Sequence, residues 1–463
     1  MAYYDMQTPI IFCGAGKWGK YLAKKAITEF YMNVVCFIDR SLSGDVEVSP
    51  GVNVPCHGYD EIPGILSENE DCIIIIATRK SEFFLEIESK LINLNVQPER
   101  IVSSWNDYLS NVFVPSEKCY CLHSLNHMLI GSKALRFCCG PLNNYYLVSE
   151  LPLNMQNHQS LDVALSTFLE RRKTTFNAAK NGLIPIMCSN CPSLEKKSLP
   201  QKQPQITFVA LSFYPAVCNA DCVYCNCGFS NKQLCNPKEA KKFEIHKFAA
   251  KTLTRLRQDN ILSNIVTCHL TAGEVSIASD KDYILDYAIE NTGDTFVIST
   301  TGIIFDQKIA YTLSANINSS LRVDMDAGTP ETYLLVKGTN KFYQVFRNLK
   351  KYCEHGNVML KYIIIPNYND DEANFKGIVN IAKELGLKSM NIDREYKHIK
   401  RNDKFITRKI LFAAAKLNIM LMNEGIEGKF RLHAWSSEHI KEVERFTILL
   451  KNIEEGESDV DNY

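Results

Sequence analysis

Three cysteines stand within eight residues, in the run Cys218-Asn219-Ala220-Asp221-Cys222-Val223-Tyr224-Cys225. The thiols are separated by three and then two residues, and an aromatic residue precedes the last one. A loop this short can turn all three sulfurs onto one corner of an iron–sulfur cube, since cysteine thiolates are the usual ligands of such clusters. Three ligands on a four-iron cluster leave one iron open.

A structural zinc site is the alternative for the same loop. Zinc in structural sites takes four protein ligands, commonly from paired Cys-x2-Cys arms. The loop supplies three cysteines in a different spacing, although Cys227 and Cys235 lie close enough in the sequence to complete a set. The segments downstream of the loop favour the iron–sulfur interpretation.

This Cys-x3-Cys-x2-Cys loop, with Tyr224 in its last gap, resembles the signature of the radical S-adenosylmethionine (radical SAM) enzymes. The resemblance implies that Cys218, Cys222 and Cys225 hold a 4Fe–4S cluster whose open iron binds S-adenosylmethionine. It further implies an external low-potential electron donor of the flavodoxin or ferredoxin type. The expected reaction is reductive cleavage of S-adenosylmethionine to a 5′-deoxyadenosyl radical, which removes hydrogen from an unactivated substrate carbon.

Apolar runs and helical stretches alternate from residue 201 to about residue 430. Strands alternating with helices predict a parallel sheet. Six such repeats, with polar residues where the strands end, predict an α/β fold that resembles a partial (β/α)6 barrel with its site at the carboxyl ends of the strands. The segment from Phe430 to Trp435 is expected to close the edge of this barrel, and His433 and Trp435 are expected to pack rather than to bind substrate.

Four strand ends carry residues that resemble the family's cofactor-binding elements. Gly273 and Glu274 resemble the glycine-acid element that receives the amino group of S-adenosylmethionine, a charge-assisted contact. Asp324 stands where the family has a serine touching the ribose, and it can still accept from ribose hydroxyls. Each residue alone also suits a helix cap or a turn. The predicted cofactor-binding residues at these strand ends are Gly273, Glu274, Ser299, Thr301, Asp324 and Asn367.

The N-terminal segment contains a Gly-x-Gly-x-x-Gly pattern in a suitable setting. The apolar run Ile10–Cys13 precedes it, and a helix, a second apolar run and Asp39 follow. In such a unit the glycines let backbone amides approach a phosphate, and the acid takes a ribose hydroxyl pair. We therefore expect a compact Rossmann-like domain that either binds a nucleotide or nucleotide-sugar or binds none. The predicted ligand-binding residues are Gly14, Gly16, Gly19 and Asp39.

Cysteines gather again between residues 116 and 200. We expect Cys121, Cys138, Cys188 and Cys191 to hold a second metal group, with Cys119 and Cys139 as alternates. The set resembles the auxiliary 4Fe–4S (SPASM-like) regions of radical SAM enzymes, and a four-cysteine zinc site remains the alternative because thiolates suit both metals. The expected domains are therefore 1–115, Rossmann-like; 116–200, auxiliary cluster region; 201–430, partial barrel; and 431–463, a C-terminal extension.

Composition limits the partners and the compartment. The chain has 463 residues, with 52 basic and 52 acidic side chains, so no overall field favours nucleic acid. Its 17 cysteines, without an N-terminal export signal, indicate metal or redox chemistry in a reducing cytoplasm. The longest aliphatic run, from Cys72 to Ala77, is too short to span a bilayer.

The sequence leaves the substrate open between a sugar or nucleotide-linked molecule and a peptide. The N-terminal domain favours the former, and the SPASM-like cysteines equally suit the latter. Two other functions are compatible with the motifs. One is a non-catalytic iron–sulfur electron-transfer or binding protein, and the other is a nicotinamide-dependent oxidoreductase that uses the N-terminal domain.

Overall fold

The computed structural model describes residues 7–78, 81–102, 105–121, 125–131, 134–136, 151–152, 160–189, 191, 194–212, 218–225, 244–271, 273–395, 404–430 and 435–454. The chain divides into two compact units. The first comprises Met1–Leu125, Leu135–Pro152 and Asp162–Pro204. The second comprises Asn126–Ala134, Leu153–Leu161 and Gln205–Tyr463. Both combine helices with mainly parallel sheets, which confirms the predicted α/β class.

The sheet of unit 1 has the strand order β3-β4-β2-β1-β5-β6. Its strands are β1 (Ile10–Cys13), β2 (Val34–Ile38), β3 (Gly44–Ser49), β4 (Val52–His57), β5 (Ile73–Ile76) and β6 (Ile101–Val102). The helices that accompany it are α1 (Lys17–Thr28), α2 (Ile62–Glu68), α3 (Ser81–Asn93) and α4 (Trp105–Ser110). All neighbouring strands are parallel except β3, which pairs antiparallel with β4.

Residues of the central strands alternate between two cores. Ile10 and Phe12 of β1 belong to the cluster that contains Trp105 of α4, whereas Ile11 and Cys13 belong to the cluster that contains Leu91 of α3. Successive strand side chains point to opposite faces, so a run that is apolar throughout is buried on both. The buried thiol of Cys13 is thus a core side chain, and burial is the main cause that raises its pKa above the usual value.

The strand β3 was not predicted from the sequence. Its residues alternate between exposed and buried, with Val46 and Val48 facing the core. It forms an edge hairpin with β4 around Gly51, whose φ of 77° lies in the left-handed region that favours glycine. Two inward valines on a polar edge strand give too short an alternating pattern to stand out in the sequence.

The cysteine-rich segment of unit 1 packs on the same core. Two short strands, β7 (Phe113–Pro115) and β11 (Leu183–Pro185), pair antiparallel. The long helix α6 (Ser160–Lys180) leads into β11, and the strands β9 (Ala134–Arg136) and β10 (Leu151–Pro152) precede it in the chain. Ile186, just after β11, joins the core cluster of Trp105 and Tyr108.

Unit 2 contains a run of parallel strands in the order β8-β12-β13-β14-β15-β16-β17-β18. These are β8 (His127–Gly131), β12 (Ile206–Ser212), β13 (Leu262–Leu270), β14 (Thr295–Thr300), β15 (Ser320–Asp324), β16 (Asn357–Ile364), β17 (Ser389–Arg394) and β18 (Glu427–Phe430). The helices are α8 (Ile245–Gln258), α9 (Lys281–Glu290), α10 (Gln307–Ala315), α11 (Pro330–Lys337), α12 (Phe342–Cys353), α13 (Glu372–Glu384), α15 (Lys404–Asn423) and α16 (Ser437–Glu454).

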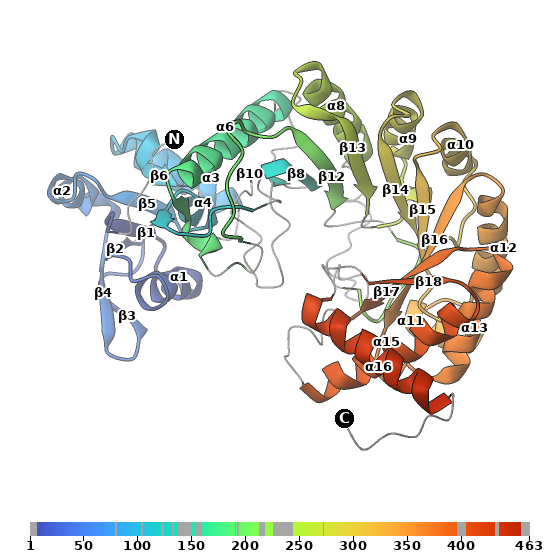
Figure 1. Ribbon diagram of the computed structural model, residues 1–463. Coiled ribbons are helices and arrows are strands. Elements are labelled where there is room, and N and C mark those ends of the chain that lie inside the picture. The colour runs from blue at the N-terminus through green and yellow to red at the C-terminus, as the bar shows by residue number, and fades with distance from the viewer. Residues whose placement is uncertain are drawn as a thin grey trace. The chain divides into compact units, whose positions relative to one another are not determined.

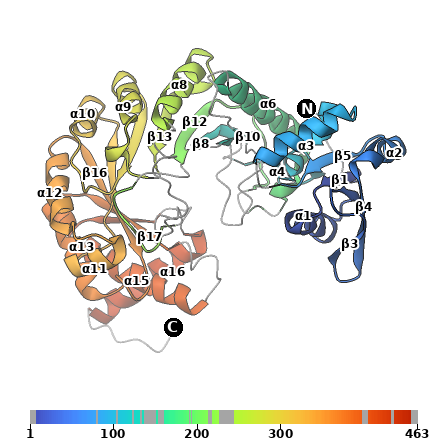
Figure 2. The same cartoon turned by 180° about the vertical axis from the view of Figure 1, so that it is seen from behind.

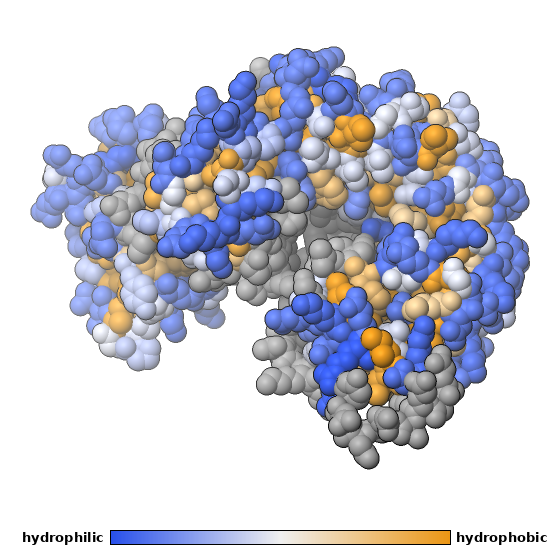
Figure 3. Space-filling view, viewed as in Figure 1, coloured by the Kyte–Doolittle hydropathy of each residue, from blue (hydrophilic) through white to orange (hydrophobic). Residues whose placement is uncertain are grey.

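The helices α8, α9, α10, α12 and α13 lie on the outer face of this curved sheet, as Figures 1 and 2 show. A parallel neighbour is reached by a crossover helix, so the carboxyl ends of β12 to β17 meet at one edge of the sheet. That edge carries the cysteine loop and Glu274, which follows β13. The space-filling view shows mostly hydrophilic residues over the outward helix surfaces, with hydrophobic residues scattered singly (Figure 3).

Two elements of unit 2, β18 and α16, were not predicted from the sequence. The strand β18 pairs parallel with β17, and α16 packs against α15. Trp435 is 1% exposed and its Nε1 donates to the carbonyl oxygen of Ile392 on β17 at 2.8 Å, which is the expected packing role. His433 lies outside the described residues. No helix in the described ranges combines the length and apolar character needed to cross a bilayer.

Candidate functional site

The loop of Cys218, Cys222 and Cys225 follows β12 at the carboxyl edge of the sheet. All three cysteines are partly buried, and none of the three forms a disulfide bond. A turn within the loop is closed by the amide of Cys225, which donates to the carbonyl oxygen of Cys222 at 3.0 Å. The loop therefore places its cysteines in a shielded position without a disulfide among them.

The electrostatics of the loop reflect the closeness of its thiols. The pKa of Cys218 is raised to about 12, first by burial and further by the charges of Glu274, Cys222 and Cys225. Burial also raises the pKa of Cys222. Thiols held in such surroundings must release their protons when a metal binds.

Among the described residues, no three His, Cys, Asp or Glu side chains converge as the ligands of a single metal ion would. In an iron–sulfur cube each thiolate binds a different iron, so its ligands stand further apart than those of one zinc ion. Cysteine thiolates are the usual protein ligands of iron–sulfur clusters, and this loop supplies three of them.

Glu274 is buried beside this loop, with 3% of its surface exposed. Its Oε1 accepts hydrogen bonds from the hydroxyls of Ser276 and Thr300, both at 2.6 Å. Its Oε2 accepts one from the amide of Thr301 at 2.5 Å. Gly273 precedes it with a φ of 73°, a conformation that favours glycine. A carboxylate has about four lone-pair sites, so Oε2 retains capacity for one further donor.

Thr301 connects the turn after β14 to the cysteine loop. Its Oγ1 donates to Oδ1 of Asn219 at 2.9 Å. Since Glu274 accepts from the amide of the same residue, the contacts join three predicted elements: the cysteine loop, the acid after β13 and the turn after β14. Ser299, on β14 itself, instead accepts from Nη2 of Arg322 at 2.7 Å.

Asp324 ends β15 in a cluster of charged side chains. Its Oδ2 accepts from Nζ of Lys361 on β16 at 2.5 Å, and Nε of Arg322 lies 3.9 Å from its Oδ1. Burial would raise the pKa of this carboxyl, but Lys361 and Arg322 outweigh it and hold the pKa well below the usual range. Asp324 is therefore an ionised acceptor at neutral pH.

Asn367 lies on the turn after β16, with a φ of 68°. It is exposed, and its Oδ1 accepts from Nζ of Lys409 on α15 at 2.8 Å. The contacts described connect it to α15 and not to the cysteine loop. Of the residues predicted at the strand ends, Asn367 is thus the one for which the contacts favour a turn.

Sequence reasoning missed a buried group next to the loop. The side chains of Tyr224, Asp326 and Lys337 meet there, with Lys337 6% and Asp326 0% exposed. Asp326 and Lys337 carry no motif of their own. The available signal was that Lys337 comes last in a helix just before Gly338, where a lysine side chain is usually solvated rather than buried.

The second group of cysteines also meets in unit 1. Cys119, Cys121, Cys188 and Cys191 all pack around Ile184 and Leu194. The chain brings them together because β7 and β11 pair antiparallel and Tyr120 forms a bridge with Glu195. The predicted ligand Cys138 and the alternate Cys139 lie outside the described residues.

The glycine turn of unit 1 lies beside a pocket of about 290 Å³. The carboxyl ends of β1, β2 and β5 line it, together with α3. Asp39 accepts from the amide of Ala15 at 2.8 Å and from the amide of Ser41 at 3.0 Å. A Cβ on Gly19 would lie 1.8 Å from the carbonyl oxygen of Gly14, whereas a Cβ on Gly16 would meet nothing within 4 Å.

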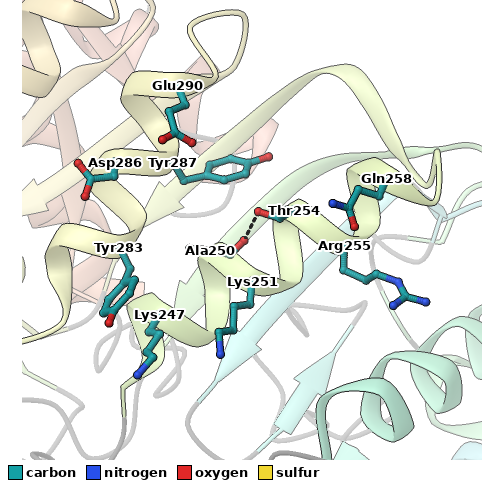
Figure 4. A pocket seen from close by; sticks show the side chains of 10 residues that line it. All are labelled: Lys247, Ala250, Lys251, Thr254, Arg255, Gln258, Tyr283, Asp286, Tyr287 and Glu290. Carbon is teal, nitrogen blue, oxygen red and sulfur yellow. Dashed lines mark hydrogen bonds between the residues drawn. The ribbon is translucent and has the colours of Figure 1, made fainter.

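Another groove, of about 310 Å³, lies between α8 and α9 on the helix layer of unit 2 (Figure 4). Its walls carry Lys247, Lys251 and Arg255 from α8 and Asp286 and Glu290 from α9. None of the residues predicted for a cofactor or a metal lines it. The groove is part of the outer helix surface, so it plays no part in the site at the strand ends.

Comparison with solved structures gives matches of low similarity. Streptococcus suis SuiB bound to precursor peptide SuiA is 13% identical over 66% of this chain and 71% of that one, with a TM-score of 0.35. Native anSMEcpe with bound AdoMet is 15% identical over 49% and 63%, with a TM-score of 0.35. TYW1 with a lysine-pyruvate adduct bound is 14% identical over 46% and 70%, with a TM-score of 0.30. No curated protein is significantly similar in sequence.

The comparison with protein families is more decisive. Residues 214–375 match the family described as the Radical SAM superfamily. The match begins just before Cys218 and ends within α13, so it includes the cysteine loop, Glu274, Thr301 and Asp324. The TM-scores are too low to add to this assignment. On the family match, residues 214–375 form a radical SAM domain.

Proposed function

We propose that Cys218, Cys222 and Cys225 hold a 4Fe–4S cluster at which S-adenosylmethionine is reductively cleaved. The observation that carries this proposal is the contact set around Thr301, which ties the cysteine loop to the buried carboxylate of Glu274. When bound, the cluster supplies the electron that releases a 5′-deoxyadenosyl radical, which abstracts hydrogen from a substrate carbon.

The chain's own residues bind and orient the cofactor. Glu274 offers the free lone pair of Oε2 to the ammonium of the methionine moiety, a charge-assisted hydrogen bond. Asp324, kept ionised by Lys361, accepts from ribose hydroxyls. Gly273, Ser299 and Thr301 shape the turns on which these acids stand, and we retain Asn367 only as a proposed residue of the adenine side.

Anaerobic reconstitution of the whole chain tests the proposal. We expect iron and sulfide to bind, and we expect 5′-deoxyadenosine to appear when dithionite and S-adenosylmethionine are added. The triple variant C218A/C222A/C225A should lose the iron of one cluster and all 5′-deoxyadenosine. The variant C353A serves as the control, because Cys353 is the last residue of α12 and is not one of the predicted ligands.

The same experiment separates the other functions. A non-catalytic iron–sulfur protein would bind iron and sulfide but form no 5′-deoxyadenosine. A nicotinamide-dependent oxidoreductase would keep its activity in the triple variant. Either result would overturn the proposed reaction.

We propose further that Cys121, Cys138, Cys188 and Cys191 hold a second metal group, with 4Fe–4S favoured over zinc. The packing of Cys121, Cys188 and Cys191 around Ile184 supports three members of the set. Because Cys119 lies in the same cluster, it competes with Cys138 for the fourth position. Iron and zinc counts on C119A and C138A decide between them. The variant that removes the true fourth ligand should lose the metal, and the other variant should keep it.

A second function is supported in unit 1, where we propose a nucleotide or nucleotide-sugar site. The supporting observation is the pocket at Gly14 and Asp39, next to the unobstructed Cα of Gly16. Because the fold leaves room for a Cβ at Gly16, G16A should fold and yet weaken binding of nucleoside diphosphates or their hexose conjugates in calorimetry. Unchanged affinity in G16A, or no binding by the wild type, argues for an empty Rossmann-like module.

The substrate proposal covers two classes, a sugar or nucleotide-linked molecule and a peptide. If unit 1 delivers a nucleotide-sugar, adding that molecule should increase 5′-deoxyadenosine formation, and G16A should lower the increase. A peptide substrate predicts stimulation that is independent of Gly16. The reductant is proposed to be a flavodoxin or ferredoxin, with dithionite standing in for it in the assay.

A further inference from the structure

The carboxyl end of α11 holds the middle of the cysteine loop. The amide of Asp221 donates to the carbonyl oxygen of Lys337 at 2.9 Å, and the amide of Val223 donates to that of Val336 at 3.0 Å. The last carbonyl groups of a helix have no partner within the helix. Here two of them are satisfied by the loop, so the helix end and the loop form one hydrogen-bonded unit.

Gly338 allows this close approach. Its φ is 66°, and a Cβ there would lie 2.9 Å from both Cβ and the carbonyl oxygen of Asp221. A side chain at this position would push the loop away from the helix. The Lys337–Gly338 end of α11 is therefore shaped to receive residues 221–223.

The side chain of Lys337 makes a second attachment to the loop. Its Nζ donates to the hydroxyl of Tyr224 at 2.6 Å and to Oδ2 of Asp326 at 2.5 Å. The hydroxyl of Tyr224 also donates to Oδ2 of Asp326 at 2.5 Å.

Asp326 is itself fixed from two directions. Its Oδ1 accepts from the amide of Ile363 at 2.7 Å, and its carbonyl oxygen accepts from Nδ2 of Asn369 at 2.8 Å. Val223 and Tyr224 pack against Val336, Ile363 and Ile365. The ion pair of Lys337 and Asp326 is thus anchored to β16 and the turn after it, and the loop is anchored to the ion pair.

The ammonium of Lys337 also acts on a thiol. Burial raises the pKa of Cys222, and the charge of Lys337 opposes that increase. The ammonium keeps its own charge, because its ion pair with Asp326 outweighs the burial that would lower the pKa of Lys337. A fixed positive charge therefore stands beside one of the three predicted ligands.

We propose that Lys337 is the positioning residue of the cysteine loop: its contacts with Asp221, Tyr224 and Asp326 give the loop its shape before any cluster binds, and its charge raises the reduction potential of the cluster. The effect on the reduction potential rests on the proposed function, whereas the effect on the shape of the loop does not. A buried ion pair often adds little to stability, but removing one partner leaves a costly unpaired charge.

Amide hydrogen exchange of the metal-free chain tests whether Lys337 shapes the cysteine loop. In K337M the backbone contacts can form, but the ammonium is lost, so peptides covering 218–225 should exchange roughly tenfold faster. K337R keeps a charged donor and should retain most of the protection. K388M is the matched control, because Lys388 is exposed, and it should match the wild type.

A double variant separates positioning from general unfolding. D326N/K337M leaves no unpaired charge, and the side-chain amide that replaces the carboxylate keeps an oxygen that can accept from the amide of Ile363. We expect fast exchange at 218–225 with wild-type exchange in α9 and α13. Wild-type protection of 218–225 in both K337M and the double variant would overturn the proposal.

Reduction potentials measured on the reconstituted chain test whether the charge of Lys337 acts on the cluster. A nearby cation favours the reduced, more negative cluster, so the potential of the loop's cluster should fall in K337M, stay near the wild-type value in K337R and not change in K388M. An unchanged potential in K337M overturns the role of the charge. If the wild type binds no cluster, the proposed function fails, while the exchange experiment still decides whether Lys337 holds the loop.

Discussion

The amide of Thr301 donates to Oε2 of Glu274 at 2.5 Å, which fixes the turn after β14 to the acid after β13. The hydroxyl of Thr301 donates in turn to Asn219 of the cysteine loop. One residue thus joins the proposed cluster ligands to the proposed cofactor acid.

Replacing Glu274 by glutamine should weaken the binding of S-adenosylmethionine by roughly tenfold or more, because hydrogen bonds to charged groups contribute about 1.5–3 kcal/mol. The glutamine amide would also face the amide of Thr301, which is another donor. Equilibrium dialysis with the reconstituted chain measures the affinity. E290Q, at an exposed position, is the control, and equal affinity in E274Q and wild type would contradict the assigned role.

Thr301→Val keeps the shape of the side chain but removes the hydrogen bond to Asn219. The loop should then be held less firmly, and iron should be lost to a chelator about fivefold faster, as expected for about 1 kcal/mol. Absorbance of the cluster during chelation gives the rate. T292V changes a threonine that is exposed and should have no effect. If T301V and T292V lose iron equally fast, the hydrogen bond from Thr301 to Asn219 does not help to retain the cluster.

Two glycines of the same turn should respond differently to alanine. In G19A the new Cβ overlaps the carbonyl oxygen of Gly14, so we expect a loss of at least about 2 kcal/mol in the free energy of unfolding of unit 1. In G16A the Cβ has open space and φ is −67°, so the loss should stay below about 1 kcal/mol. Urea unfolding followed by tryptophan fluorescence measures both, and equal losses would refute the packing argument.

Asp39 should stabilise unit 1 in a pH-dependent way. Burial would raise its pKa, but hydrogen bonds from the amides of Ala15 and Ser41 lower it below the usual value. The contribution of Asp39 to the free energy of unfolding is therefore complete above its pKa in the unfolded chain, about 3.9. It is lost as the pH falls through the lower pKa of Asp39 in the folded chain. D39N should be less stable than the wild type at pH 7, with the difference shrinking below about pH 4 in denaturant titrations. D45N, at an exposed carboxyl, is the control and should keep the wild-type stability at pH 7.

The elements that the sequence predicted well have strong local patterns. The apolar runs of β1 and β5 are buried on both faces, and the glycine turn between β1 and α1 stands where the spacing places it. The alternation from β12 to β17 follows the same logic, since each strand and helix carries its own periodicity. The elements that were missed, β3, β18 and α16, lie at edges, where half-exposed residues blur that periodicity.

By itself, the sequence determined the α/β class, the alternation of strands and helices from β12 to β17, and the cysteine loop at the end of β12, because apolar periodicity and ligand spacing are properties of neighbouring residues. Only the tertiary structure decided that Cys119 lies in the same cluster as Cys188, that Thr301 reaches Asn219, and that Lys337 meets Tyr224 from 113 positions away. Such contacts depend on how parallel strands bring their ends to one edge, and no local pattern records which side chains then meet.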